Sequence, residues 1–86
     1  MEKYRIVFKK SVAKDLRIIP NTDVKRILKR IDELAENPRA VGCIKLTGEE
    51  KYRVRQGLYR IVYEIRDNEL VVTVIKIGHR SSVYQN

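Results

Sequence analysis

The sequence predicts an α+β fold in which two consecutive helices pack on one face of an antiparallel sheet. Three features lead to this prediction. Residues 24–35 carry apolar side chains at helical spacing, residues 51–66 alternate as two strands around a short turn, and residues 70–77 form an apolar run of strand length. The predicted element order is β-α-α-β-β-β. With 86 residues, the chain is expected to form one domain that spans positions 1–86.

The N-terminal part is expected to contain a strand and a short helix. Residues 4–8 (YRIVF) alternate weakly and fit a strand. Ser11 is a candidate N-cap for a helix that reaches Ile19, because a serine oxygen accepts a hydrogen bond from a free N–H of the first turn. Pro20 is expected to end this helix.

A longer helix is expected to follow directly. Asn21 or Thr22 can cap it, and Asn37-Pro38 ends it at about Glu36. Its apolar residues recur at the spacing that places them on one stripe facing a sheet: Val24, Ile27, Leu28, Ile31, Leu34 and Ala35. Since the two helices are consecutive, they are expected to form a hairpin that covers a single sheet face.

The second half of the chain is expected to supply three antiparallel strands. Residues 51–56 and 59–66 flank a two-residue turn at Gly57-Leu58, and a second turn precedes residues 70–77. This last run is apolar on both faces, as in a central strand, and Gly78 is expected to end it. The N-terminal strand must join the same sheet to become buried, which leaves one sheet face without a helix.

Arginines gather on that open face. A two-residue turn pairs Gln56 with Tyr59 and therefore places Arg55 opposite Arg60, with Arg53 two residues away on the same side. Like charges directly opposite one another destabilise a hairpin by up to about 1 kcal/mol. An anion bound between the two guanidinium groups reverses the sign of that effect. The pattern therefore favours a phosphate or carboxylate site.

Composition narrows the possible partners. The 19 Lys and Arg outnumber the 11 Asp and Glu, which gives a net charge of +8 and favours nucleic acid, an acidic protein or an anionic membrane as partner. The single cysteine, Cys43, excludes an intramolecular disulfide and a cysteine-based zinc site. The N-terminus lacks the apolar segment of a signal peptide, and no apolar run is long enough to cross a bilayer. We therefore expect a cytoplasmic protein without a membrane association.

The C-terminal tail adds a histidine, an arginine and an aromatic residue. His79 is the only histidine, a residue type suited to proton transfer, and Arg80 follows it. Tyr84 can fold back over the open face. An aromatic ring beside arginines can stack on a nucleobase while the guanidinium groups hold its phosphate.

These residues carry a resemblance to a known family. The stretches KLTGEEKYRVRQGLYRIVYEI and VVTVIKIGHRSSVY, in the predicted element order, resemble the RelE/ParE superfamily of toxin–antitoxin toxins. The most specific parts are the Tyr-[Arg/Lys]-x-[Arg/Lys] strand, the Gly-x-Tyr-Arg element and the closing Gly-His-Arg-x-x-Val-Tyr. The similarity spans nearly the whole chain, and within the superfamily the RelE branch is the closer match.

The resemblance implies an endoribonuclease toxin that cuts mRNA in the ribosomal A site and inhibits translation. The family uses neither metal nor cofactor: the ribose 2′-OH attacks the adjacent phosphate and leaves a 2′,3′-cyclic phosphate. The implied partners are the ribosome, its mRNA and a cognate RelB-like antitoxin. The sequence agrees in one respect, because it offers no cluster of Asp, Glu and His for Mg²⁺ or Zn²⁺.

The resemblance also implies roles for individual residues of the hairpin. Arg53 and Arg55 fall on two basic positions of one strand, and Arg60 falls on the arginine that clamps the scissile phosphate. Lys51 is a further cation of the same strand, and we expect it to hold RNA together with Arg53. Thr47 replaces a basic residue of the family, which removes one phosphate contact.

Further roles fall on the tail, and one of them stays open. Arg80 matches the arginine proposed to protonate the leaving 5′ oxygen, and Tyr84 matches the tyrosine that stacks on the mRNA base. The position of the general base, usually lysine, is Arg55 here. A guanidinium group is a poor base, so Arg55 is expected to act through its charge. His79 then becomes the better candidate for proton transfer.

Two other functions remain as alternatives. A ParE-type toxin binds DNA gyrase and catalyses nothing itself, although such relatives generally lack the full cationic set and the terminal tyrosine. A binding-only module would use the basic groove to hold an acidic antitoxin peptide and would leave mRNA intact.

Overall fold

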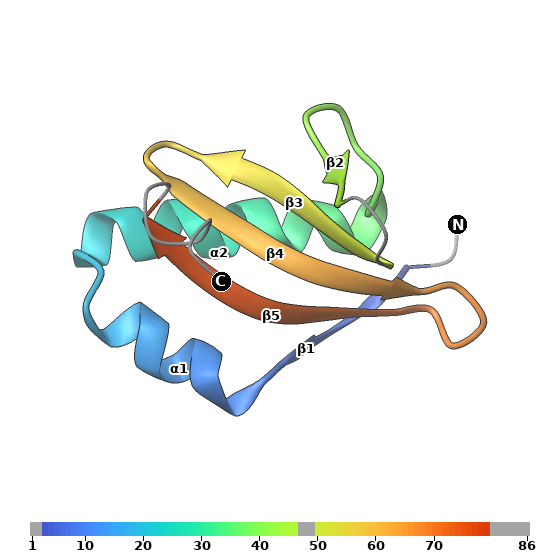
Figure 1. Cartoon of the computed structure of the whole chain (residues 1–86), viewed down its shortest axis with the longest axis horizontal. Coiled ribbons are helices and arrows are strands. Elements are labelled where there is room, and N and C mark those ends of the chain that lie inside the picture. The colour runs from blue at the N-terminus through green and yellow to red at the C-terminus, as the bar shows by residue number, and fades with distance from the viewer. Residues whose placement is uncertain (1–2, 47–49, 80–86) are drawn as a thin grey trace.

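The computed structural model describes residues 3–46 and 50–79. Two helices and five strands make up one α+β unit (Figure 1). The single sheet has the strand order β1-β5-β4-β3-β2. In chain order the elements are β1 (Arg5–Phe8), α1 (Lys10–Arg17), α2 (Asn21–Glu36), β2 (Ile44–Lys45), β3 (Lys51–Gln56), β4 (Tyr59–Arg66) and β5 (Val71–His79).

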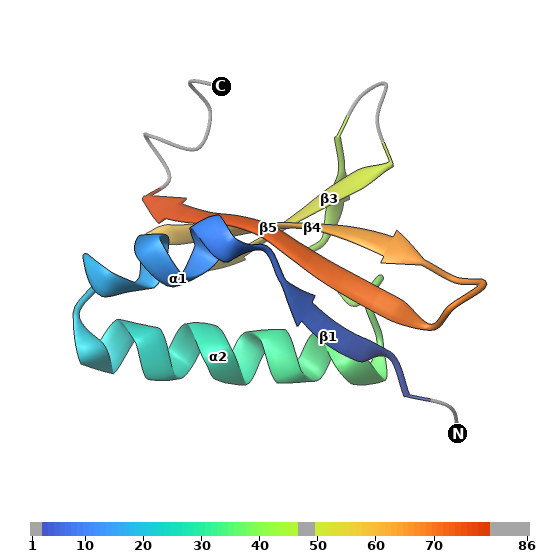
Figure 2. The same ribbon diagram turned by 90° about the horizontal axis from the view of Figure 1, so that it is seen from below.

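Both helices lie on one face of the sheet, as the sequence predicted (Figure 2). The core lies between these two layers, because the apolar stripe of each helix faces the inward side chains of β3, β4 and β5. Its most deeply buried members are Val12, Ile27, Ile31, Leu34, Val54, Ile61, Tyr63, Val72, Val74 and Ile77. No helix in the described part of the chain is long and apolar enough to cross a membrane.

The hairpin is confirmed residue by residue. Gln56 pairs with Tyr59 and Arg55 with Arg60 across the turn. Gly57 has a φ of 61°, a left-handed conformation that glycine adopts without a steric penalty. Tyr63 is fully buried, and its hydroxyl donates a hydrogen bond of 2.7 Å to the carbonyl oxygen of Pro38. Burial raises the pKa of this phenol.

The sheet differs from the prediction in two respects. It is not antiparallel throughout, because β1 runs parallel to β5, from the pair Arg5–Val71 to the pair Phe8–Val74. A fifth strand is also present, since Ile44 and Lys45 of β2 pair with β3. With only two residues, both exposed, β2 offers no alternation that a sequence pattern could reveal.

The helix ends also differ from the prediction. Lys9 precedes α1 and Pro20 precedes α2, and neither helix start has a side-chain capping bond. Ser11, Asn21 and Thr22 are therefore not caps. The backbone carbonyl of Pro20 instead accepts hydrogen bonds from the backbone N–H groups of Asp23 and Val24 in the first turn of α2. The helix α1 ends at Arg17 and does not reach Ile19.

Strand β5 continues past the predicted end. Gly78 does not terminate it, because Gly78 pairs with Arg60 and His79 with Tyr59. Between the pairs Val62–Lys76 and Tyr63–Val74 the register shifts, which leaves one extra residue on β5. This bulge changes the alternation of the strand. It allows Val72, Val74 and Ile77 to face the helices together.

Beyond the last residue pair between β1 and β5, helix α1 contacts the edge of β5. The contact is made by Asp15, whose Oδ2 accepts a hydrogen bond of 3.1 Å from the backbone N–H of Ile77. Its Oδ1 lies 3.5 Å from Nζ of Lys76. A backbone N–H group that has no neighbouring strand to pair with is thereby satisfied by a side chain.

A second polar contact joins the opposite end of the sheet to the loop after α2. Both guanidinium Nη atoms of Arg39 donate to the carboxylate of Asp67, at 3.0 and 2.9 Å, and the Tyr4 hydroxyl donates to the same carboxylate at 2.7 Å. The Arg39 guanidinium also lies 5.4 Å from the centre of the Tyr52 ring. Hydrogen bonds from Arg39 and then Tyr4 lower the pKa of Asp67 to about 2.

Candidate nucleic-acid interface

The cationic side chains of the hairpin share the sheet face that lacks helices. Tyr52 and Val54 of β3 are buried toward the helices, so the residues that alternate with them, Lys51, Arg53 and Arg55, belong to the opposite face. Across the ladder, Arg55 lies opposite Arg60, as the sequence predicted. Figure 2 shows both helices on the other side of the sheet. This sheet face therefore carries positive charge and no described helix.

Each cation has a different cross-strand neighbour. Arg53 lies opposite Val62, and Lys51 lies opposite Glu64, which partly offsets its charge. Arg55 faces another arginine. The positive charge is therefore most concentrated at the turn end of the hairpin, where Arg55 and Arg60 meet.

Arg60 differs from its neighbours by its burial. Its exposed fraction is 7%, whereas Arg55 is exposed, and in the described ranges Arg60 is the one charged residue in the buried class. A positive charge with little access to water interacts more strongly with a bound anion than a solvated charge does. A fixed guanidinium can also present two N–H groups to two phosphate oxygens.

Gly78 is a member of this face that the sequence did not reveal. It is the β5 neighbour of Arg60 in the ladder, and it contributes no side chain there. The available signal was a glycine next to the last strand, and a glycine within a strand often marks the close approach of a ligand or another backbone. The sequence predicted that Gly78 ends the strand, whereas the strand continues to His79.

The structure does not bring His79 together with the arginines. Strand alternation places His79 with Ile77 on the side of the sheet that bears the helices, opposite Arg60. Its ring meets the Tyr59 ring edge-on, with the centres 6.0 Å apart. Both rings line a hollow of about 230 Å³ next to Asp15 of α1.

The remaining predicted site residues, Arg80 and Tyr84, lie outside the described residues, as does Thr47. Their roles remain predictions. Among residues 3–46 and 50–79, no group of three or more His, Cys, Asp or Glu side chains is arranged to hold a metal ion.

Comparison with known proteins decides the family. Residues 6–84 match the family described as ParE toxin of the type II toxin–antitoxin system parDE. The chain belongs to this toxin family. Among the relatives of the toxin, the mRNA interferase toxin RelE of Escherichia coli is 34% identical and aligns with 94% of this chain and 90% of its own length.

Solved structures of related toxins share the fold. The archaeal RelE–RelB complex from Pyrococcus horikoshii is 30% identical, covers 93% of this chain and 98% of the matched chain, and gives a TM-score of 0.80. The isolated E. coli RelE toxin is 32% identical, with coverages of 94% and 90% and a TM-score of 0.78. The α+β architecture of this toxin is thus that of RelE.

Proposed function

We propose that this toxin is an endoribonuclease that cleaves mRNA, the activity named for its E. coli RelE relative. One observation carries the proposal: Arg60 is buried beside Arg55 on a sheet face that no described helix covers. Two adjacent guanidinium groups stabilise a folded hairpin poorly unless an anion lies between them. In a relative of an mRNA interferase, the scissile phosphate of mRNA is that anion.

The reaction follows from the position of these charges. The ribose 2′ oxygen attacks the adjacent phosphorus, and the bond from phosphorus to the 5′ oxygen breaks. The products are a 2′,3′-cyclic phosphate and a free 5′-hydroxyl group. Negative charge accumulates on the equatorial oxygens of the pentavalent phosphate, where Arg60 and Arg55 stabilise it. Arg53 and Lys51 bind the neighbouring phosphates of the RNA.

Two proton transfers complete the reaction. Arg80 donates a proton to the leaving 5′ oxygen, and Tyr84 stacks on the mRNA base to orient the attack; both assignments come from the family resemblance. The proton of the 2′-OH passes to water, because Arg55 is a poor base and His79 belongs to the other face of the sheet. Arg55 supports this step through its positive charge.

We also propose the ribosome, mRNA and a cognate RelB-like antitoxin as partners, and a reaction without metal or cofactor. Support for the antitoxin comes from related structures, which include the RelE–RelB complexes of P. horikoshii and E. coli. The net charge of +8 favours association with RNA and with an acidic protein.

The test is primer extension on a reporter mRNA after a short pulse of expression, in translating cells and in cells whose translation is blocked. Discrete new 5′ ends inside the reading frame, present only during translation, are the expected result. Growth arrest with intact mRNA contradicts the proposal.

A second candidate is a gyrase-binding toxin without catalytic activity, because the matching family carries the ParE name. A DNA supercoiling assay with purified gyrase tests it. Inhibition that survives the substitution Arg60→Ala would favour this candidate, since a buried phosphate-binding arginine has no role in it.

A further inference from the structure

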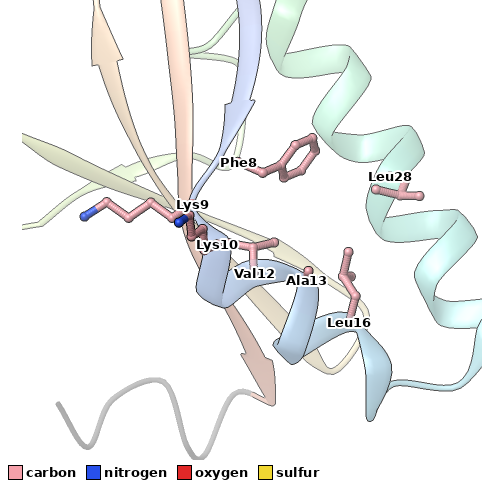
Figure 3. Close-up of a pocket in the computed structure, with 7 residues that line it drawn as sticks. All are labelled: Phe8, Lys9, Lys10, Val12, Ala13, Leu16 and Leu28. Atoms are coloured by element: carbon pink, nitrogen blue, oxygen red, sulfur yellow. The ribbon is translucent and has the colours of Figure 1, made fainter.

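The hollows of the molecular surface differ in the elements that they border. Figure 3 shows Phe8, Leu16 and Leu28 pointing into an apolar hollow of about 360 Å³ between β1, α1 and α2. Leu28 is 39% exposed there, although the sequence placed it in the buried stripe of α2. Another hollow, of about 300 Å³, lies at the end of the hairpin remote from its turn. This second hollow borders the strands that carry the proposed phosphate site.

The second hollow forms where β4 extends beyond β3. Strand β3 begins at Lys51, which pairs with Glu64, whereas β4 continues to Arg66. The residues around the resulting notch are Glu50, Glu64, Ile65 and Arg66. The volume is at the lower end of those that hold small ligands, and it suits a single nucleobase.

Glu64 differs from the other charged residues of this hollow in its contacts. Oε1 of Glu50 lies 3.9 Å from Nζ of Lys45, and Nη1 of Arg66 lies 3.9 Å from Oε2 of Glu69. The carboxylate of Glu64 is half-buried and forms no hydrogen bond or ion pair with any residue that the structure describes. An ionised carboxylate only accepts hydrogen bonds, so a ligand with N–H donors is the chemical match for Glu64.

A carboxylate at this position opposes the binding of phosphate. Glu64 follows the buried Tyr63, and strand alternation therefore places it on the same sheet face as Arg60. Its negative charge repels the RNA backbone that the arginines of this face attract. The same charge favours RNA binding where it meets a base that carries hydrogen-bond donors, and it then discriminates against other bases.

The cations of β3 define a path for the RNA backbone. Arg55, Arg53 and Lys51 occupy every second residue and are therefore about 6.8 Å apart along the strand. Consecutive phosphates of an extended RNA strand are separated by a similar distance. When the scissile phosphate lies at Arg60, the second nucleotide along this row lies beside Glu64, which is four residues or about 14 Å further along β4.

We propose that Glu64 recognises the base two nucleotides from the scissile phosphate and selects guanine. The inference rests on the proposed function, which supplies the RNA. Guanine presents two adjacent donors, N1–H and N2–H, on its Watson–Crick edge, and one carboxylate accepts both hydrogen bonds. Adenine, cytosine and uracil each place an acceptor next to their donor, and that acceptor is repelled by the carboxylate. Thr73 pairs with Glu64 in the β4–β5 ladder, and its hydroxyl donates to O6 of the same guanine.

The test measures cleavage of ribosome-bound reporter mRNAs in which the nucleotides around one cleavage site are randomised. The wild-type toxin should cut sequences with guanine two nucleotides from the cut, on one side, roughly 5- to 150-fold faster than the others, the usual discrimination of a bidentate base contact. Inosine at this position lacks the N2 amino group and should remove most of that advantage. Glu64→Gln should cut all four sequences at similar rates, because an amide offers one donor and one acceptor and matches every base.

Glu69→Gln is the matched control, because it removes the same charge at the same end of β4 and should keep the guanine preference. Melting temperatures check the fold of each variant. A guanine preference that survives in Glu64→Gln would overturn the inference, and so would wild-type cleavage without a base preference at this distance. A lower melting temperature of Glu64→Gln with an intact preference would assign Glu64 to the pairing with Lys51 instead.

A binding measurement separates this inference from the proposed nuclease. If the wild-type toxin leaves mRNA intact, the nuclease proposal fails, and short single-stranded RNAs that carry guanine or inosine at one position decide the role of Glu64. Tighter binding of the guanine RNA by the wild type, and equal binding of both RNAs by Glu64→Gln, would keep the assignment. Equal binding of both RNAs by the wild type would overturn it.

Discussion

Arg60 is the residue on which the proposed chemistry depends most, because it combines burial, a second guanidinium at the neighbouring ladder position and a glycine on its other side. Arg60→Ala should lower mRNA cleavage by about 10²–10³-fold, the usual effect of removing one group that stabilises transition-state charge. Arg60→Lys should recover only part of this loss, because lysine lacks the bidentate fork.

Arg66→Ala is the matched control for Arg60→Ala. Arg66 belongs to the same strand and the same face but lies at the far end of β4, where its Nη1 is 3.9 Å from Glu69. Cleavage assays on translated mRNA should show no loss for Arg66→Ala. Equal losses for both arginines would show that general positive charge, and not the Arg55–Arg60 pair, drives the reaction.

His79 gives a second prediction at the level of single residues. Removal of a proton-transfer group lowers a rate by roughly 10²–10⁴-fold. Because His79 contacts Tyr59 on the helix side, His79→Gln should instead leave the cleavage rate within about threefold of the wild-type rate. The pH profile between 6 and 8 should keep its shape. If the variant instead lost an ionisation between pH 6 and 8, His79 would be shown to take part in the reaction.

Local sequence patterns predicted the arginine site more completely than its surroundings. The Arg55–Arg60 pair follows from one glycine turn and the two-residue period of a strand. The side of the sheet on which His79 lies could not be predicted. Gly78 was expected to end the strand, so strand alternation could not be extended to the residue after it. The burial of Arg60 depends on tertiary packing, which no local pattern encodes.

Among the elements, β5 depends on a contact from a helix. Asp15 of α1 accepts a hydrogen bond from the backbone N–H of Ile77, beyond the part of β5 that pairs with β1. Asp15→Ala should lower the free energy of unfolding by about 1–3 kcal/mol, because a part-buried donor is left without its acceptor. Asp15→Asn keeps an acceptor oxygen and should cost less. Hydrogen exchange of the Ile77 amide should accelerate most in the alanine variant; unchanged exchange there would contradict the role of Asp15.

The Asp67 contact makes a pH-dependent contribution at the other end of the sheet. Its pKa is lowered to about 2 in the folded chain by Arg39 and Tyr4, below the value of about 3.9 for an unperturbed aspartate. A carboxylate with a lowered folded-state pKa stabilises the fold above its unfolded pKa, and this stabilisation is lost as the pH falls through about 2. Asp67→Asn should therefore reduce the melting temperature at pH 7, and the difference from wild type should shrink between pH 4 and pH 2.

Glu69→Gln serves as the control for Asp67→Asn, since Glu69 lies in the same turn and its carboxylate is 3.9 Å from Arg66. It should change the melting temperature less at either pH. A constant effect of Asp67→Asn across the acid range would show that the aspartate acts through its shape and not through its charge.

The elements themselves were predictable to different degrees. The long helix, the hairpin and the apolar last strand follow from periodicity, and the structure contains all three. The first residues of both helices could not be predicted from polar capping residues, because no side chain makes a capping hydrogen bond at either helix start. The parallel pairing of β1 depends on contacts between the two ends of the chain.

At the scale of the whole molecule, charge should govern RNA affinity. Binding to a single-stranded RNA that carries 2′-deoxyribose at the cleavage site should weaken linearly on a plot of log affinity against log salt. Removal of one phosphate contact, as in Arg53→Ala, should reduce the slope by about 0.7. Lys29→Ala, on the outer side of α2, should leave the slope unchanged. If the slope fell equally in both variants, RNA binding would depend on the total positive charge of the protein and not on the arginine face.

The pairing of β1 with β5 also has a consequence for how the toxin folds during its synthesis. One edge of the sheet is assembled from β1, near the start of the chain, and β5, the last of the described strands, and such distant contacts form late and slowly in folding. Until β5 has been synthesised, β1 has no strand to pair with and Arg60 lacks its neighbour Gly78. The first strand of the toxin therefore has to wait for the fifth before it can join the sheet, and the phosphate site is completed at the same step.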